Sequence, residues 1–195
     1  MSDPGGVRGM SVVEAIRARR SIKDFSPRAV GQAEIEALLD AAVQAPNHRL
    51  TRPWRFYVLG PASRAAYGRA LGERKARRVA DADAGRIVME KVAGEYAATP
   101  CMIAVAMTVH DNPEIREEDY AATMMAVQNI LLACVAQGLG GHIRTGAVMD
   151  DPAARAAVGV VQDERIVALI SVGEPAEMPP PKERPAAAGH TTWVP

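Results

Sequence analysis

The chain has 195 residues, 48% of them hydrophobic, which is enough for one domain with a core of its own. Its 23 Lys and Arg residues balance its 23 Asp and Glu residues, so no net charge draws it to nucleic acid or an anionic membrane. We therefore expect neither kind of partner. Cys101 and Cys134 lie in apolar runs, which indicates reduced, buried thiols and a cytoplasmic location.

The N-terminal region contains no apolar run like that of a signal peptide, and we expect residues 1–10 to be flexible. No stretch approaches the uninterrupted apolar length of a membrane span. A capping box, Ser11 with Glu14 three residues later, begins the first predicted helix, which ends near the sequence RRS. A second helix is predicted over about residues 31–44, and Pro46 stops it.

The middle of the chain alternates strand and helix patterns. WRFYVLG, residues 54–60, predicts a strand. Residues 61–96 are rich in Ala and charged side chains, which predicts exposed helices with a break near Gly85. CMIAVAMTV, residues 101–109, is a continuous apolar run typical of a central, buried strand. Residues 117–138 are apolar on nearly all sides of a helix, which predicts a long core helix.

The last part of the chain predicts two more strands, a helix and an arm. GLGGHIRTG, residues 138–146, is a glycine-rich turn that leads into a short strand. Asp151 and Pro152 begin another helix as its cap and first residue. Residues 165–173 form an apolar strand pattern. Residues 177–195 are too rich in proline for a core element and predict an extended arm.

Several kinds of catalytic site have no candidate in this sequence. There is no Walker loop and no G-x-G-x-x-G between a strand and a helix, which weakens an NTPase or Rossmann interpretation. The four histidines lack the spacing of metal ligands, so we expect no metal site. No Ser or Cys lies in a nucleophile elbow, which removes the usual hydrolase candidates.

The sequence RARRSIKDF, residues 17–25, gathers four cations and one hydroxyl at the predicted end of the first helix. Cations are favoured there in any helix, because they meet the negative end of the helix dipole. The same residues would also suit a phosphate, because Arg forks and a hydroxyl can donate several hydrogen bonds to it. The pattern alone allows both interpretations.

Three motifs occur in a fixed order: RRSIKDF, APNHRLTRPWRFYVL and GLGGHIRTG. Together they resemble the nitroreductase superfamily of FMN-dependent oxidoreductases, over most of the chain from Val13 to the arm. The middle motif is most similar to the branch of small NAD(P)H nitroreductases that carry P-x-H before a P-W pair. The chain departs from the family pattern at Arg52, where Gln is common before Pro-Trp, and at Ile143, where Trp is common.

The resemblance implies an α+β fold in which helices wrap a central, mostly antiparallel sheet. It also implies an intertwined homodimer with two FMN sites at the interface. We accordingly expect residues 11–176 to form a single domain and residues 177–195 to pack as an arm on the partner subunit.

The resemblance also implies a set of cofactor-binding residues. An Arg-x-Ser-x-Lys pattern at the end of the first helix grips FMN, a K-x-R pair in the arm closes over the phosphate, and residues near the second helix approach from the neighbouring subunit. Three residues after the long helix lie beside the ring. Alternatives stay open for the arm, as a solvated tail, for the histidine, as a structural residue, and for the threonine, as an ordinary strand residue. The full set is Arg19, Arg20, Ser21, Lys23, Gln44, His48, Ile143, Arg144, Thr145, Lys182 and Arg184.

The expected activity follows from the cofactor, because FMN carries the electrons and the protein orients it. The resemblance implies NADPH or NADH as reductant, a nitroaromatic or quinone as oxidant, and ping-pong kinetics. We assign no catalytic side chain. The alternatives are a dehalogenase or flavin-fragmenting enzyme on the same fold, a flavin-binding protein without turnover, and a helical interaction module without a cofactor.

Overall fold

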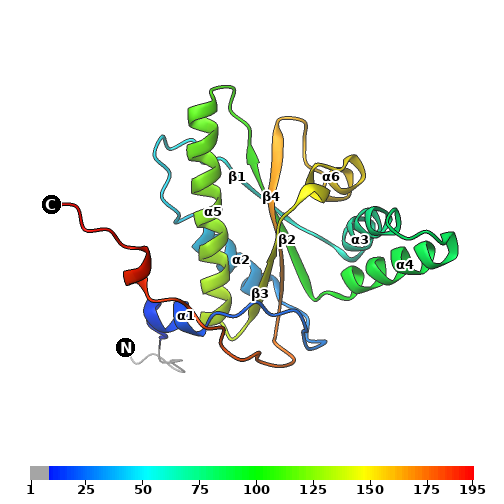
Figure 1. Ribbon diagram of the computed structural model, residues 1–195, viewed down its shortest axis with the longest axis horizontal. Helices are drawn as coiled ribbons and strands as arrows, with labels where there is room; N and C mark the ends of the chain where they lie inside the picture. Colours follow the sequence, from blue (N-terminus) through cyan, green and yellow to red (C-terminus); the bar gives the residue numbers. More distant parts are fainter. Residues whose placement is uncertain (1–8) are drawn as a thin grey trace.

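The computed structural model describes residues 9–195, so most of the N-terminal segment expected to be flexible lies outside the described residues. The described chain is α+β, with one four-stranded sheet in the order β1-β2-β4-β3 and antiparallel pairing throughout (Figure 1). The expected fold class is therefore confirmed, and a purely helical module is excluded. The strands are β1 (Trp54–Val58), β2 (Cys101–Thr108), β3 (Gly140–Arg144) and β4 (Glu164–Gly173).

Helices cover both faces of the sheet (Figure 1). Helices α2 and α5 pack on one face, while α3, α4 and α6 pack on the other. Two short 3-10 turns complete the elements: η1 (Ala147–Asp150) lies between β3 and α6, and η2 (Ala187–His190) lies in the C-terminal segment. The α-helices are α1 (Val12–Ala18), α2 (Gln32–Ala42), α3 (Pro61–Ala76), α4 (Ala82–Ala98), α5 (Pro113–Ala136) and α6 (Pro152–Val158).

Strand β2 lies inside the sheet between β1 and β4, as its apolar run predicts. Successive side chains of a strand point to opposite faces, so an uninterrupted apolar strand can serve two cores. Ile103 and Val105 join the core beneath α2 and α5, whereas Met102 and Ala104 join the core beneath α3, α4 and α6. All four side chains have no exposed surface.

Helix α5 begins earlier than expected, at Pro113, because Asn112 caps it by accepting a hydrogen bond from the Glu114 N–H at 2.9 Å. It ends at Ala136, two residues before the predicted stop at Gly138, whose φ of +71° glycine adopts without strain. By length and composition α5 could span a membrane, so the expectation that no stretch approaches that length was wrong. A buried stripe that includes Ala126 and Ile130 packs on the sheet, which is the arrangement of a core helix.

The break between α3 and α4 falls at residues 77–81, and Gly85 lies inside α4, so the predicted break was several residues too late. Asp81 is the N-cap that decides this boundary, since its carboxylate accepts a hydrogen bond from the Ala84 N–H at 2.7 Å. The predicted exposure holds for only one side of the helical hairpin that α3 and α4 form. A Cβ on Gly68 would lie 2.7 Å from the Tyr96 Cβ, so the two helices approach closely there.

The segment after α1 is attached to the free edge of β3. Ser21 forms a parallel bridge with Gly141, and the Ile22 N–H donates to the Gly141 carbonyl at 3.2 Å. Ile22 is 2% exposed and lies against Gly140, where an added Cβ would come within 2.3 Å of the Ile22 Cγ1. The glycine therefore lets the basic segment reach the sheet.

We predict that Gly140→Ala displaces Ile22 and lowers the free energy of unfolding by about 1 to 3 kcal/mol, the usual cost of overpacking a core. Gly94→Ala is the matched control, because a Cβ at Gly94 in helix α4 meets no atom within 4 Å. Alanine is the better helix former, so the control should keep or slightly raise stability. Urea unfolding measures both, and equal midpoints for the two variants would contradict the packing assigned to Ile22.

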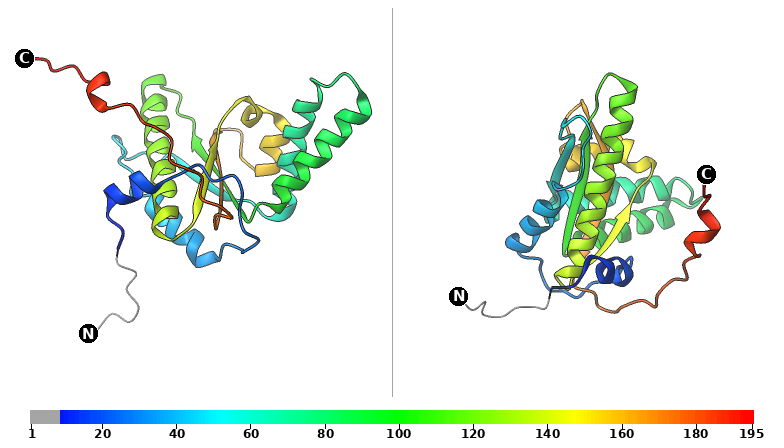
Figure 2. Two further views of the ribbon diagram at one scale, coloured as in Figure 1. Left: turned by 60° about the horizontal axis from the view of Figure 1, so that its bottom comes forward. Right: turned by 90° about the vertical axis from the view of Figure 1, so that its left-hand side faces the viewer.

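The C-terminal segment leaves the sheet after β4, passes beside α1 and ends away from the body of the domain (Figure 2). Every residue from 176 to 195 is exposed, and Trp193 keeps 90% of its surface accessible. Apart from η2 this segment is extended, as its prolines predict.

Candidate functional site

A cavity of about 1060 Å³ opens between the end of α1, one side of α5 and the first part of the C-terminal arm. Its volume lies just above the usual range for small-molecule sites, roughly 300 to 1,000 Å³. The residues that line it are Ile16, Arg17, Arg19, Arg20, Ser21, Lys23, Asp24, Met124, Val127, Gln128, Leu131, Ile143, Glu177, Pro179, Pro180, Pro181, Lys182 and Arg184.

The rim of this cavity is strongly basic. It carries six cationic side chains, four from residues 17–23 and two from the arm, against the carboxylates of Asp24 and Glu177. None of the six cations forms a salt bridge with any residue that the structure describes. Because excess positive charge in a concave site attracts and concentrates anions, the rim is suited to an anionic ligand.

Arg20 is consistent with both interpretations of the basic cluster. Its Nη1 donates to the carbonyl oxygens of Arg17 at 2.6 Å and Arg19 at 3.1 Å. Arg20 therefore does meet the carbonyl end of α1, as the helix-dipole interpretation expects. A guanidinium has five N–H donors, so the remaining ones stay available to a ligand. Arg17 and Arg19 make no such contact with the helix end and line the cavity.

The floor of the cavity is mostly apolar, with Gln128 of α5 as its one polar side chain among the described residues. Met124, Val127 and Leu131 come from one side of α5, at helical spacing, and Ile143 comes from β3. Sequence reasoning did not single out this side of α5, because the helix is apolar nearly all round and no stripe stands out. It also left Arg17 out of the predicted cofactor-binding set, whereas Arg17 lines the cavity.

The structure brings seven of the predicted cofactor-binding residues together in this cavity. Two of the others, Gln44 and His48, lie elsewhere in the same chain. Gln44 is exposed just beyond α2, and His48 lines a second pocket of about 380 Å³ between its loop and α5. The seven are Arg19, Arg20, Ser21, Lys23, Ile143, Lys182 and Arg184.

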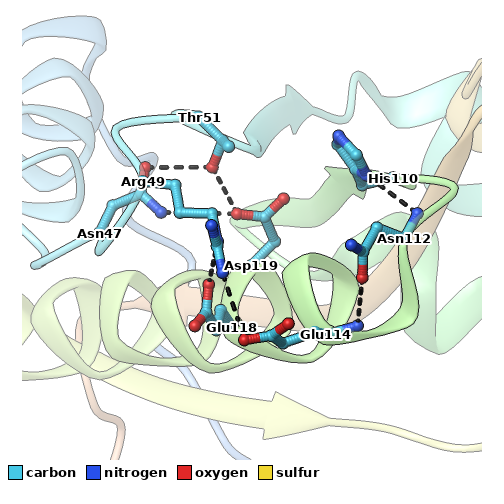
Figure 3. A network of polar contacts seen from close by, with 8 residues as sticks. All are labelled: Asn47, Arg49, Thr51, His110, Asn112, Glu114, Glu118 and Asp119. Carbon is cyan, nitrogen blue, oxygen red and sulfur yellow. Dashed lines mark hydrogen bonds and ion pairs between the residues drawn. The ribbon is translucent and has the colours of Figure 1, made fainter.

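The loop that carries His48 is held in a defined shape by side chains (Figure 3). The Asn47 Oδ1 accepts hydrogen bonds from the Arg52 N–H at 2.7 Å and from the Thr51 hydroxyl at 3.2 Å. The Thr51 hydroxyl also lies against the buried carboxylate of Asp119 on α5. These contacts hold Arg52 at a φ of +48°, in a region that non-glycine residues rarely adopt.

A second set of contacts fastens the same loop to α5 (Figure 3). Arg49 forms ion pairs with Glu118 at 2.7 Å and with Glu114 at 3.3 Å. Glu118 raises the pKa of the Arg49 guanidinium through their hydrogen bond and charge interaction. The loop therefore presents His48 at a fixed, exposed position on the surface.

Arg144 and Thr145 do not line the cavity. The Arg144 guanidinium donates to the hydroxyl of the buried Ser171 and lies over the Tyr96 ring, 5.3 Å from its centroid. It therefore points to the opposite face of β3 from Ile143. Tyr96 in turn stacks on Tyr67, with ring centroids 5.9 Å apart. In this chain the side chain of Arg144 holds β3 to β4 and α4, and Thr145 is exposed just after the strand.

His142 lies on β3, close enough to Arg144 and Lys23 to sense the charges of both. Its Nδ1 is buried and has no hydrogen-bond partner among the described residues. Burial, and then the charges of Arg144 and Lys23, lower the pKa of the imidazole from 6.5 to about 4. Because this pKa lies below the unfolded value, the fold favours the neutral ring. The stability that His142 contributes is complete above pH 6.5 and is lost as the pH falls toward 4.

We predict that lowering the pH from about 7 to about 4.5 costs the unaltered protein about 1 kcal/mol more unfolding free energy than it costs His142→Gln. The effect is smaller than the full linkage value because the ring is part-exposed and solvent screens its charge. Carboxylates with a lowered pKa, such as Glu14 and Glu34, act mainly below their usual value of 4.5. Urea unfolding at several pH values measures the difference, and parallel curves for the two proteins would contradict the burial assigned to His142.

Comparison with known proteins gives consistent results. A model of the nitroreductase family matches residues 16–174. The chain is 31% identical over 172 residues to the "Putative NAD(P)H nitroreductase YfhC" of Bacillus subtilis, covering 88% of each protein. It is 28% identical over 167 residues to the "Putative NAD(P)H nitroreductase YdjA" of Escherichia coli K12, covering 85% of this chain and 89% of that protein.

Solved structures share the fold. A nitroreductase-like family protein from Bacillus cereus superposes with a TM-score of 0.81 at 26% identity, covering 97% of this chain and 99% of that one. A "putative nitroreductase in complex with fmn" from Desulfovibrio desulfuricans superposes with a TM-score of 0.71 at 24% identity, covering 100% and 99%. The nitroreductase-like fold expected from the three motifs is thereby confirmed.

Proposed function

Because the chain belongs to the nitroreductase family, we propose that it is an FMN-dependent oxidoreductase that takes electrons from NAD(P)H and passes them to a small oxidant. The observation that carries this proposal is the division of the large cavity into a basic rim and an apolar floor. The relatives named as NAD(P)H nitroreductases and the similar structure that holds FMN support the same activity.

The donor set of the cavity fits FMN. The cofactor has a phosphate with close to two negative charges at one end and a flat, largely apolar ring system at the other. Arg19, Arg20 and the Ser21 hydroxyl supply donors to a phosphate, and no described carboxylate already neutralises the two arginines. The α5 side chains and Ile143 supply an apolar surface of the kind that a ring requires.

The two arm cations would complete this site. Lys182 and Arg184 come from the arm and line the same cavity as residues 17–23, so they can add charge to the phosphate end. The position of these two cations at the cavity favours a ligand-binding role for the arm over a solvated tail. The residues of the arm are themselves all exposed. We therefore propose that the arm contributes to flavin affinity.

Bound FMN would supply the redox chemistry, the transfer of electrons from NAD(P)H to an oxidant such as a nitroaromatic or a quinone. The residues of this chain bind and orient it. Lys23, two residues beyond Ser21, lines the cavity and would hold its ammonium nearer the ring than the phosphate. A cation beside the ring favours added negative charge there. We assign no side chain as a general acid or base, since orientation and electrostatics suffice for this chemistry.

We propose that the functional unit is a homodimer. Val12, Val13 and Ile16 on α1 keep 69%, 54% and 53% of their surface accessible, and Trp193 of the arm keeps 90%. Apolar surface of this extent is typical of an interface. In such a dimer Gln44 and His48 would approach the flavin of the neighbouring subunit, since neither residue lines the cavity of its own chain. A cytoplasmic location stays a prediction.

A steady-state screen tests the activity. NADH and NADPH are each paired with nitroaromatic, quinone and halogenated compounds, and initial rates are measured over a grid of both substrate concentrations. Ping-pong turnover with a nitroaromatic or quinone gives parallel lines in double-reciprocal plots. Dehalogenation of a halogenated substrate alone, or loss of the flavin during turnover, would instead favour the dehalogenase or flavin-fragmenting alternative. Bound flavin that neither nicotinamide reduces would favour a binding protein without turnover.

A further inference from the structure

The arm is fastened where it leaves the sheet, before it reaches the cavity. Residues 174–176 run antiparallel to residues 24–26, with a bridge between Phe25 and Pro175. The Ser26 N–H donates to the Glu174 carbonyl at 2.8 Å, and the Ala176 N–H donates to the Asp24 carbonyl at 3.1 Å. The two segments are therefore paired over three residues.

The side chain of Glu174 reinforces this pairing. Its Oε2 accepts a hydrogen bond from the Ser26 hydroxyl at 2.6 Å, and its Oε1 lies 3.7 Å from the Arg28 Nε. Arg28 is itself held by both carboxylate oxygens of Glu34, each at 3.1 Å. Glu34 accepts the Gly31 N–H at 2.8 Å, so the chain of contacts ends at the start of α2.

Close packing fixes the position of the pairing along the chain. A Cβ on Gly173 would lie 2.9 Å from the Phe25 ring and 3.0 Å from the Pro100 side chain. The ring therefore lies directly on the backbone at the end of β4. A shift of the arm relative to residues 24–26 would have to move this ring.

Both paired segments lead directly into the basic rim. Lys23 and Asp24 line the cavity on one side of the pairing, and Glu177 lines it on the other. The distance along the chain from Ala176 to Lys182 is six residues, and that stretch contains three consecutive prolines, which stiffen it. The direction in which the arm leaves the pairing thus sets where its cations lie.

We propose that Glu174 is a positioning residue, which holds the arm so that Lys182 and Arg184 face the basic cluster at residues 17–23. The proposal rests on the proposed function, since it takes the ligand of this rim to be the FMN phosphate. Glu174 does not touch the cavity itself. It acts by fixing the arm, and the exposed Arg28 contact adds little to the attachment.

The test measures FMN affinity of the flavin-stripped full chain by quenching of flavin fluorescence. Glu174→Ala removes the acceptor for Ser26 and should weaken FMN binding about five- to tenfold, the equivalent of one ordinary hydrogen bond. Ser26→Ala removes the donor and should have a similar effect. Glu174→Gln keeps an acceptor oxygen and should restore most of the affinity. Glu95→Ala, which breaks the exposed Lys91–Glu95 ion pair on α4 outside both pockets, should leave FMN affinity unchanged.

A second background separates positioning from a general loss of structure. In Lys182→Ala/Arg184→Ala the arm has no cations to position, so Glu174→Ala should cause little further loss, because the two effects are coupled. An equal loss in both backgrounds, or no loss in either, overturns the proposal. Failure of the proposed function would look different, since the unaltered chain would then bind no FMN.

Discussion

Arg19→Ala should weaken FMN binding by roughly tenfold or more, since one lost hydrogen bond to a charged group is worth about 1.5 to 3 kcal/mol. Arg19 lines the cavity beside the Ser21 hydroxyl and has no salt-bridge partner among the described residues. Its removal should therefore change the stability of the fold little and weaken binding of the phosphate strongly. Arg69→Ala, an exposed arginine on α3 outside the cavity, is the matched control and should bind FMN normally.

Arg20→Ala should lower FMN affinity to a similar extent and should also lower stability. The added stability loss is expected because the Arg20 guanidinium donates to two carbonyl oxygens at the end of α1. FMN titration of the flavin-stripped chain together with urea unfolding separates the two effects. Unchanged FMN affinity in both Arg19→Ala and Arg20→Ala would contradict the assignment of the basic cluster to the phosphate.

Deleting residues 177–195 should loosen both the flavin and the dimer. The truncation removes Lys182, Arg184 and one wall of the cavity, and with it the exposed Trp193. FMN affinity should fall at least as far as in the Lys182→Ala/Arg184→Ala variant, because the wall is lost as well as the charges. The population of dimer should fall at low protein concentration, since subunit association stabilises the folded state by mass action.

Light scattering and FMN titration of the truncated and full chains, at equal concentration, measure these two effects. The variant Trp193→Ser serves as a control that removes the apolar side chain while it keeps the arm and its cations. It should weaken the dimer more than it weakens FMN binding. A truncated protein that stays dimeric with full FMN occupancy would show that residues 177–195 serve neither role.

The sequence predicts the elements of this fold well wherever one local signal dominates. The capping box at Ser11, the apolar run of β2 and the Asp151-Pro152 helix start all form as expected. The α3–α4 break was misplaced because glycine signals a break only weakly, whereas Asp81 caps α4 through a specific hydrogen bond. Gly85 is buried inside α4, where a side chain would approach Ala76.

The candidate site was predicted in part. The basic cluster and the arm pair carry charge in a recognisable pattern, and the fold brings them to one cavity. The apolar floor on α5 could not be singled out, because core packing and ligand contact use the same residue types. Arg144 illustrates the opposite problem. Its place in a motif predicts a ligand contact, yet Ser171 and Tyr96 hold its side chain on the far face of β3.

Two departures from the family pattern affect the surroundings of the cavity. Ile143 lines the floor where the family commonly has Trp, so the side chain at this position is smaller and has no aromatic face. Arg52 occupies a left-handed position that the Asn47 side chain supports, which fixes the loop beside His48. Both differences leave the basic rim intact, and we expect them to alter the choice of oxidant rather than the binding of flavin.

The absorbance spectrum of the purified protein tests the central claim most directly. We predict a yellow protein with close to one FMN per chain, identified after release of the cofactor, whose visible absorbance bleaches when NADPH or NADH is added without oxygen. Added FMN should bind to the stripped chain with the same stoichiometry. A colourless protein that binds no FMN in such a titration would contradict the account.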